Sequence, residues 1–251
     1  MKKLILTISC ILLLLLPASA IAPDMGMIHG SHIRLKNGTS LNWSGYAVET
    51  NLSSPQNYAV SDVKGVWTVP PVTDTINSYS STWIGIDGYS DNTVEQIGTD
   101  SDWYNGAPRY YAWYEMYPKW SVNIKSLNIN PGDTISAEVK YIGNNKFSLS
   151  ITDVTTGQTY TTTQKGKAKR QSAEWIVEAP SSTGGVLPLA NFGSDVFTSC
   201  YATVAGATGS VNDVRWQNDA ITMVSSGGAL KAQPSELSPD GTSFGVTWYS
   251  H

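Results

Sequence analysis

The residues of this chain that could act in catalysis are acids, amides and aromatic rings. Histidine is absent from positions 33–250, where a rigid scaffold could hold it. The three histidines, His29, His32 and His251, all lie near the chain ends. Serine and cysteine nucleophiles need an imidazole held rigidly beside them, and zinc hydrolases usually include histidine ligands. We therefore expect no such site unless a terminus folds into the core, and no metal or cofactor. We interpret His29 and His32 as a solvated pair on a flexible arm.

The composition argues against several further classes of function. No glycine-rich loop follows a predicted strand in the pattern that cradles phosphates or a dinucleotide. No strong basic patch suggests a nucleic acid as partner. Only 14% of the residues are charged, against about 25% in a typical globular protein. Because acid unfolds proteins mostly through carboxylates that must stay ionised, this composition suits an acidic medium.

The first twenty residues have the three parts of a secretory signal. Lys2 and Lys3 form the positive start, an apolar run extends over 5–16, and Ala18-Ser19-Ala20 is a small-residue cleavage site. The run is too short for a comfortable membrane span. We expect cleavage after Ala20 and a secreted, extracellular protein with no membrane attachment. Cys200 then has no partner for an intrachain disulfide, and its surroundings favour a buried thiol.

Beyond Asn42 the chain consists of short runs rich in Val, Ile, Thr, Tyr and Trp, separated by turn residues. The predicted strands are 59–69, 82–86, 93–97, 109–117, 134–142, 146–152, 158–163, 173–178, 196–204, 220–224 and 243–249. Turns are predicted at 130–133, 143–145 and 156–157, and 225–242 is interpreted as a long loop. The pattern favours an all-β fold, an antiparallel two-sheet β-sandwich. We expect one domain over 42–251, preceded by a short leader or pro-segment over 21–41.

Side chains alternate across a strand, so their parity in the sequence sorts the polar residues by face. Glu174 and Glu178 share a face with Ile176. The other shared faces are Tyr111, Trp113, Glu115 and Tyr117; Trp83, Gly85 and Asp87; and Val94, Gln96 and Gly98. Faces that combine acids, amides and aromatic rings suit a concave cleft with a few polar groups. Parity alone is equally compatible with a solvated face that carries scattered acids.

Five segments, taken together and in order, carry a family resemblance. They are Asn42-Trp43-Ser44-Gly45-Tyr46, Trp83-Ile84-Gly85-Ile86-Asp87-Gly88, Glu95-Gln96-Ile97-Gly98-Thr99-Asp100, Tyr111-Ala112-Trp113-Tyr114-Glu115-Met116-Tyr117-Pro118 and Ala173-Glu174-Trp175-Ile176-Val177-Glu178. One such segment is weak evidence, whereas five in order at compatible spacing are strong. The chain resembles the glutamic peptidases, also called eqolisins, from about Asn42 to about Ala202.

This resemblance implies a sandwich of two large antiparallel sheets with a lectin-like or glucanase-like (concanavalin A-like) topology, and a cleft on one concave sheet. It implies catalytic roles for Gln96 and for Glu178, rather than Glu174. The substrate-binding or supporting residues that it implies are Trp43, Trp83, Asp87, Asp100, Trp113 and Glu115.

The expected activity is that of a secreted endopeptidase that cuts unfolded or acid-denatured proteins at acidic pH. Glu178 would act as general base on a water molecule, and the Gln96 amide would stabilise the oxyanion. Asp87, Asp100 and Glu115 would aim the Gln96 amide and share protons. The expected partners are protein or peptide substrates, and the expected state is a monomer.

Two other functions fit a similar sandwich. A glycoside hydrolase would use paired carboxylates, but Glu174 and Glu178 are four strand steps, about 13 Å, apart, too far for either known arrangement. A pair across strands, such as Glu115 with Glu178, stays open. A non-catalytic carbohydrate-binding sandwich is the second alternative, because a fold does not determine a function.

Overall fold

A computed structural model describes residues 27–36 and 38–251 of the chain. The predicted secretory signal therefore lies outside the described residues, as does the first part of the predicted leader. The described part contains strands, turns and loops but no helix, and accordingly none that is long and apolar enough to cross a membrane.

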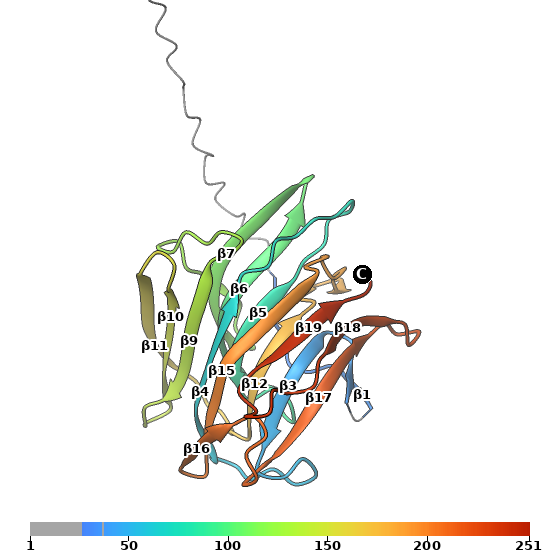
Figure 1. The fold of residues 1–251 in the computed structure, drawn as a ribbon. Helices are drawn as coiled ribbons and strands as arrows, with labels where there is room; N and C mark the ends of the chain where they lie inside the picture. The colour runs from blue at the N-terminus through green and yellow to red at the C-terminus, as the bar shows by residue number, and fades with distance from the viewer. Residues whose placement is uncertain (1–26, 37) are drawn as a thin grey trace, which may run out of the picture.

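Two antiparallel sheets form the molecule, and each has seven strands in its main run (Figure 1). The first sheet contains, in spatial order, β17 (Gln217–Val224), β3 (Trp43–Glu49), β12 (Ser172–Glu178), β5 (Ser81–Ile86), β6 (Val94–Tyr104), β7 (Ala107–Tyr117) and β8 (Val122–Asn123). The second contains β18 (Leu230–Pro234), β19 (Phe244–Trp248), β15 (Ser194–Val204), β4 (Val60–Thr68), β9 (Thr134–Tyr141), β10 (Lys146–Asp153) and β11 (Gln158–Lys165). The predicted all-β, two-sheet sandwich is confirmed.

Five short strands lie outside these two runs. They are β1 (Arg34–Lys36), β2 (Thr39–Ser40), β13 (Ser181–Ser182), β14 (Gly185–Val186) and β16 (Ala207–Ser210). β1 pairs with β2, and β2 runs parallel to β17. β17 also pairs with β18, so that the two sheets are joined along this edge. The chain just before the first long strand is thereby attached to the first sheet.

The strand predictions missed the short strands β1, β2, β8, β13, β14 and β16, and their largest errors concern three longer strands. β3 was missed because all seven of its residues are buried, which removes the alternation on which the prediction relied. β18 lies in the segment interpreted as a loop, where glycines and prolines mask it. β6 continues to Tyr104, far beyond the predicted end, because Asn105 and Gly106 adopt positive φ and turn the chain tightly into β7.

The hydrophobic core lies between the two sheets and includes Trp67, Phe147, Trp175 and Phe197. Cys200 is also buried there and is a free thiol, as predicted. Two indole N–H groups cross between the sheets. Trp67 on β4 donates to Thr99 on β6 at 2.9 Å, and Trp175 on β12 donates to Lys64 on β4 at 2.7 Å. These bonds attach β6 and β12, which carry the two predicted catalytic residues, to the opposite sheet.

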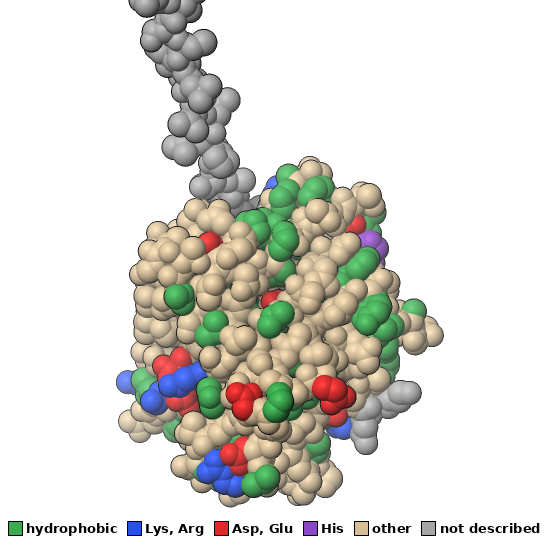
Figure 2. Space-filling view, viewed as in Figure 1, with side chains coloured by type: hydrophobic (Ala, Val, Ile, Leu, Met, Phe, Trp, Pro, Cys, Tyr) green, Lys and Arg blue, Asp and Glu red, His purple; other side chains and the backbone are tan. Residues whose placement is uncertain are grey.

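The outer face of the first sheet is also buried. Every residue of β3, β5 and β12 is buried, although in a two-layer sandwich one face of each strand would normally meet solvent. A second cluster of aromatic and aliphatic side chains, with Trp43, Trp83 and Trp113 at its centre, lies on this outer face. In Figure 2, which has the view of Figure 1, the charged side chains gather toward the lower end of the molecule.

Candidate active site

The sheet register brings the predicted catalytic residues onto one face. Gln96 on β6 lies opposite Gly85 on β5 and Glu115 on β7. Glu178 is the last residue of β12 and lies opposite Trp43 on β3 and Ser81 on β5. The faces that parity predicts for β12 are confirmed, because Ile176 joins the outer aromatic cluster, whereas its neighbour Trp175 joins the core.

Gly98 makes room for two of the aromatic rings. It lies between Trp83 and Trp113 in the sheet register. A Cβ atom at this position would collide with the Thr82 carbonyl and with the Trp83 side chain. Any larger residue would therefore displace Trp83, whose indole N–H donates to Glu178 Oε2 at 2.9 Å.

Glu178 is fully buried and is surrounded by N–H donors. Besides Trp83, Asn42 Nδ2 donates to its Oε1 at 3.4 Å, and the backbone N–H of Gly30 donates to the same oxygen at 3.0 Å. Burial raises the pKa of Glu178 well above its usual range, and the positive charge of His29 and the bonds from Trp83 and Asn42 oppose that rise. Asn42 was not among the predicted site residues, although it belongs to the first of the five motifs.

Gln96 is also fully buried. Its Nε2 donates a short hydrogen bond to the backbone carbonyl of His29, and its Oε1 has no hydrogen-bond partner among the described residues. The side chain therefore offers one donor aimed at a peptide carbonyl and one unused acceptor beside it. Gln96 and Glu178 meet at a single peptide unit, the one that joins His29 to Gly30.

Asp100 organises the wall next to Gln96. It accepts from Trp113 Nε1 at 2.6 Å and from the Tyr111 hydroxyl at 2.7 Å. The same hydroxyl lies 2.9 Å from Asp102. Burial, and next the charge of Asp100, raise the pKa of Asp102 well above its usual range, so that Asp102 is protonated in acid. Tyr111 and Asp102 are functional candidates that the sequence reasoning did not select, although Tyr111 was placed on the correct face.

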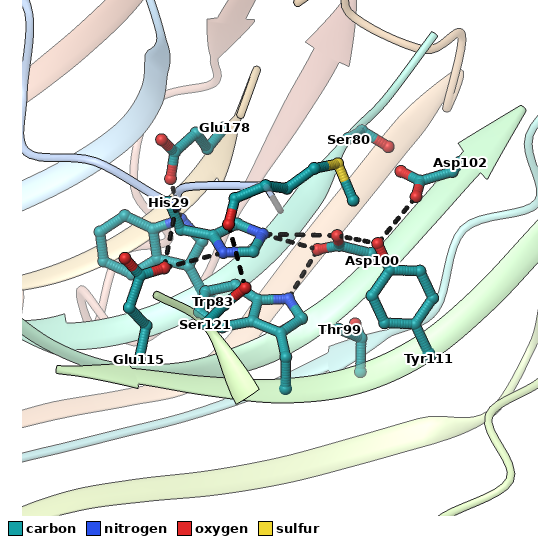
Figure 3. Close-up of polar contacts among 12 residues, drawn as sticks. His29, Ser80, Trp83, Thr99, Asp100, Asp102, Tyr111, Glu115, Ser121 and Glu178 are labelled. Atoms are coloured by element: carbon teal, nitrogen blue, oxygen red, sulfur yellow. Dashed lines mark hydrogen bonds and ion pairs between the residues drawn. The ribbon is translucent and has the colours of Figure 1, made fainter. Parts of the chain in front are cut away.

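His29 lies inside this site, so the interpretation of His29 and His32 as a solvated pair is wrong. Its side chain is 1% exposed and stacks on Trp113 with ring centroids 3.5 Å apart. Nδ1 lies 3.1 Å from Glu115 and Nε2 lies 3.3 Å from Asp100 (Figure 3). Burial alone would lower the pKa of His29, but the two carboxylates outweigh it and raise the pKa to about 10. His29 is therefore an imidazolium ion, held between two acids.

The chain around His29 fills the cleft as an extended peptide. Ile28 exchanges two backbone hydrogen bonds of 2.9 Å with Ser181, and the carbonyl of Met27 accepts from Ser121 at 3.1 Å. On the other side, the carbonyl of Gly30 accepts from Trp43 Nε1 at 3.1 Å. His32 stacks between Trp43 and Tyr89, with ring centroids 5.4 and 5.2 Å away. This occupation explains why the outer face of the first sheet is buried.

Asp87 does not join this group, contrary to the expectation from the resemblance. It follows β5 at the end opposite to Ser81, and its carboxylate accepts from the backbone N–H groups of Arg170 and Gln171 at 2.6 Å each. The other five predicted supporting residues lie in the cleft. Each contacts Glu178, the segment around His29 or another cleft residue, and they are Trp43, Trp83, Asp100, Trp113 and Glu115.

A separate group of buried acids surrounds Asp87. Glu49, Asp87, Glu95 and Glu174 are at most 1% exposed. Desolvation by burial is the largest cause of their raised pKa values, which reach about 7 for Glu49 and Asp87 and about 9 for Glu95. The pKa of Glu174 is also raised well above its usual range, and neither of its oxygens has a hydrogen-bond partner among the described residues. These carboxyls are neutral in acid.

We expect the fold to be most stable in acid and to lose stability toward neutral pH. In the unfolded chain these carboxyls titrate near pH 4. Because their folded pKa values are higher, the stabilisation is complete below about pH 4 and is lost as pH rises through 7 to 9. Together they should lower Tm by about 10 °C or more between pH 4 and 7.5, as measured by scanning calorimetry.

The variant Glu174→Gln should reduce this pH dependence, because it removes one buried charge at neutral pH and changes little in acid. Glu236→Gln, at an exposed position, is the matched control and should leave the profile unchanged. A Tm that is equal or higher at pH 7.5 would contradict the expectation.

A hollow of about 460 Å³ lies elsewhere, on strands of the second sheet. Its one acid, Glu138, is paired with Lys64 at 2.9 Å. It offers no pair of carboxylates, and none of its lining residues belongs to the first sheet. Among the described residues, no group of three or more His, Cys, Asp or Glu side chains is arranged to hold a metal ion.

Residues 41–238 match the model of the peptidase A4 family. Aspergillopepsin-2 of Aspergillus niger is 33% identical over 159 residues, which are 59% of this chain and 56% of that relative. The aligned part thus spans little more than half of that protein.

Solved structures of the same kind share the fold. Scytalido-glutamic peptidase with a transition state analog inhibitor superimposes with a TM-score of 0.69 at 24% identity, covering 83% of this chain and 98% of that one. SCP-B, a member of the eqolisin family in complex with the tripeptide Ala-Ile-His, gives a TM-score of 0.65 at 23% identity with the same coverage. The family match, which extends over most of the chain and includes every cleft residue from Asn42 to Glu178, shows that this protein belongs to the peptidase A4 family.

Proposed function

We propose that this protein is an endopeptidase that hydrolyses unfolded or acid-denatured proteins at acidic pH, with Glu178 as general base and Gln96 as oxyanion stabiliser. The observation that carries the proposal is the way in which the cleft holds a peptide backbone. The N–H of His29 donates to Glu115 and the N–H of Gly30 to Glu178, each at 3.0 Å. The two carbonyls that follow these N–H groups accept from Gln96 and Trp43.

Four consecutive backbone groups are thus each bound by a different side chain. Backbone hydrogen bonds of this kind read the main chain and not a particular side chain, as expected for an enzyme that acts on many proteins. A sugar has no alternating N–H and C=O groups to match this pattern. The arrangement therefore favours peptide over carbohydrate as the substrate.

The chemistry follows from the two groups at the His29–Gly30 peptide unit. In the proposed reaction, Glu178 removes a proton from a water molecule as the water oxygen attacks the carbonyl carbon. The Gln96 amide N–H stabilises the negative charge on the carbonyl oxygen, and its free Oε1 accepts from the attacking water. Glu178 then returns the proton to the leaving nitrogen.

Two features of the site bear on the pH of this chemistry. Glu178 must be ionised to act as base, and burial, the largest cause, raises its pKa. The N–H donors Trp83 and Asn42 oppose that rise and favour the carboxylate. Asp102 remains protonated, and therefore neutral, in acid. Its neighbour Asp100 accepts from the Trp113 indole N–H and so holds that ring in place.

Supporting roles follow from the contacts in the cleft. Trp43 and Trp83 position the substrate carbonyl and the Glu178 carboxylate through their indole N–H groups. Asp100, Trp113 and Glu115 form the pocket for the side chain before the cut bond. We propose that the protein acts outside the cell, as a monomer on protein or peptide substrates.

A substrate panel at pH 3 to 7 tests the proposal. Acid-denatured globin and casein should be cut to peptides with a maximum in acid, whereas β-glucans, xylan and other polysaccharides should be neither cut nor bound. Peptides should be cut at bonds that lie far from both of their free ends. This result separates endopeptidase from exopeptidase action. Release of reducing sugars without proteolysis would contradict this proposal and would indicate a glycoside hydrolase.

A further inference from the structure

One hydroxyl group in the wall of the cleft lies between two buried acids. The Tyr111 oxygen is 2.7 Å from Asp100 Oδ2 and 2.9 Å from Asp102 Oδ2 (Figure 3). A hydroxyl has a single hydrogen atom, so it donates to one of these oxygens and must accept from the other. One of the two carboxyl groups therefore carries a proton, and the three groups form a hydrogen-bonded chain.

The remaining partners of the two acids place this proton on Asp102. Asp100 also accepts from the Trp113 indole at 2.6 Å, and His29 Nε2 lies 3.3 Å from it. The one side-chain hydrogen bond of Asp102 in the described structure is that with Tyr111, and its Oδ1 has no partner there. Burial of a carboxylate with so few donors is costly, whereas a neutral carboxyl group is tolerated. Asp102 thus donates to Tyr111, and Tyr111 donates to Asp100.

The groups that face Asp102 agree with this placement. They are Asp100 on its own strand, Arg109 and Tyr111 on β7, His29 in the cleft, and Tyr79 and Ser80 at the start of β5. Burial, and next the charge of Asp100, raise the pKa of Asp102 well above its usual range and outweigh the Tyr111 bond, the charge of His29 and the Ser80 N–H, which lower it. The Arg109 guanidinium lies over the Tyr104 ring, 4.3 Å from its centroid.

The other end of the chain is part of the floor of the cleft. Asp100 fixes the Trp113 indole, and the His29 ring stacks on that indole with centroids 3.5 Å apart. Asp100 also lies in the same cross-strand row as Glu178, with Ser81 between them. If Asp102 ionised, the single hydrogen of Tyr111 would have to serve two anions. Asp100 would then lose a donor, and a second negative charge would lie beside it.

We propose that Asp102 is a positioning residue, whose proton holds Asp100 and the Trp113 ring in place through the Tyr111 hydroxyl, and that loss of this proton ends activity at the upper limit of the pH range. The inference rests on the proposed peptidase function. Neither Asp102 nor Tyr111 touches the peptide unit between Gln96 and Glu178, so both act through Asp100. The coupled acids release this proton as one unit.

The variant Asp102→Asn tests the proposal through the pH profile of kcat/KM. The asparagine NH₂ supplies to Tyr111 the hydrogen that protonated Asp102 supplies, and it keeps that hydrogen at every pH. Rates are measured with a soluble peptide from the globin digest between about pH 3 and 8. The falling limb of the profile should move upward by about one pH unit or more in Asp102→Asn.

Asp195→Asn is the matched control. Asp195 is 1% exposed, accepts from the Thr82 hydroxyl at 2.5 Å and has one oxygen without a partner in the described structure. Burial raises its pKa to about 7. Thr82 precedes Trp83 on β5 and so faces away from the cleft. The control should therefore leave the falling limb within about 0.3 pH unit of wild type.

Tyr111→Phe breaks the chain at its middle and keeps both acids. It should lower kcat/KM in acid about tenfold or more, and adding Asp102→Asn to it should move the falling limb no further. An equal shift with and without Tyr111 would show that Asp102 acts by its charge alone, and would overturn the inference. If Asp102→Asn does not fold, a wild-type rate and profile in Tyr111→Phe would overturn it.

Two further results would overturn the inference and leave the proposed function intact, provided that wild type cuts globin. One is an unchanged falling limb in folded Asp102→Asn. The other is an equal shift in Glu174→Gln, which would assign the limb to unfolding. Circular dichroism at each pH verifies that the variants are folded. Failure of the wild-type protein to cut globin at any pH would instead contradict the proposed function itself.

Discussion

Replacing Glu178 by glutamine is expected to lower kcat for acid-denatured protein by at least a thousandfold. The amide has the size of the carboxylate but cannot take a proton from water, and general base catalysis is typically worth 10²–10⁴ in rate, about 3–5 kcal/mol. Glutamine also turns an NH₂ group toward N–H donors such as Trp83 Nε1, which now donates to a carboxylate oxygen at 2.9 Å. KM should change little, because most contacts with the substrate backbone remain.

Glu174→Gln is the matched control for this experiment. Glu174 lies on the same strand and the same face, four residues away, and is equally buried. It belongs to the separate acid group around Asp87 and touches no residue of the cleft segment in the described structure. Its variant should retain activity within about threefold. Activity of Glu178→Gln within tenfold of wild type, or equal losses in both variants, would contradict the assignment of Glu178.

The choice between these two acids marks the limit of what local sequence pattern could predict. Parity placed Glu174 and Glu178 on one face, and this is what the sheet shows. The two differ only in what lies across the neighbouring strands: Glu178 is opposite Trp43 and Ser81, whereas Glu174 is opposite Ala47 and Gly85. Strand register depends on contacts between segments far apart in the chain, so the resemblance, and not the pattern, separated the two.

The fold was predictable where strands have one face in the core and one in solvent. β9 and β10 alternate almost perfectly between buried and partly exposed residues, and their ends were predicted within one residue. β3 has no such alternation because the leader covers its outer face. The same cause hid His29, whose contact with Glu115 spans 86 residues of sequence. When a segment from elsewhere in the chain covers a strand, the sequence of the strand itself does not show that its outer face is buried.

Asp87 was misplaced for a related reason. Trp83, Gly85 and Asp87 share parity, but Asp87 follows the end of β5, where a positive φ of 72° breaks the strand geometry. Parity holds only while the chain stays extended. Beyond Ile86 the carboxylate turns toward the N–H groups of Arg170 and Gln171, at the far end of the sheet from Glu178.

Replacing Gln96 by alanine is expected to lower kcat and kcat/KM by a hundredfold or more. The Nε2 donor meets a peptide carbonyl in the closed cleft, and its bond strengthens as negative charge develops on that oxygen. The loss of one oxyanion donor typically costs about 3–4 kcal/mol of transition-state stabilisation. An interaction made chiefly in the transition state appears in kcat and leaves KM nearly unchanged.

Gln158→Ala provides the control, because Gln158 begins β11 at an exposed position of the other sheet. It should have wild-type kinetics. The cavity left by Gln96→Ala will also lower stability, since the side chain is fully buried, so that kinetics should be measured well below the Tm of the variant. A kcat within fivefold of wild type in folded Gln96→Ala would remove Gln96 from the chemistry, and the short bond to the His29 carbonyl would then serve only to hold the leader in place.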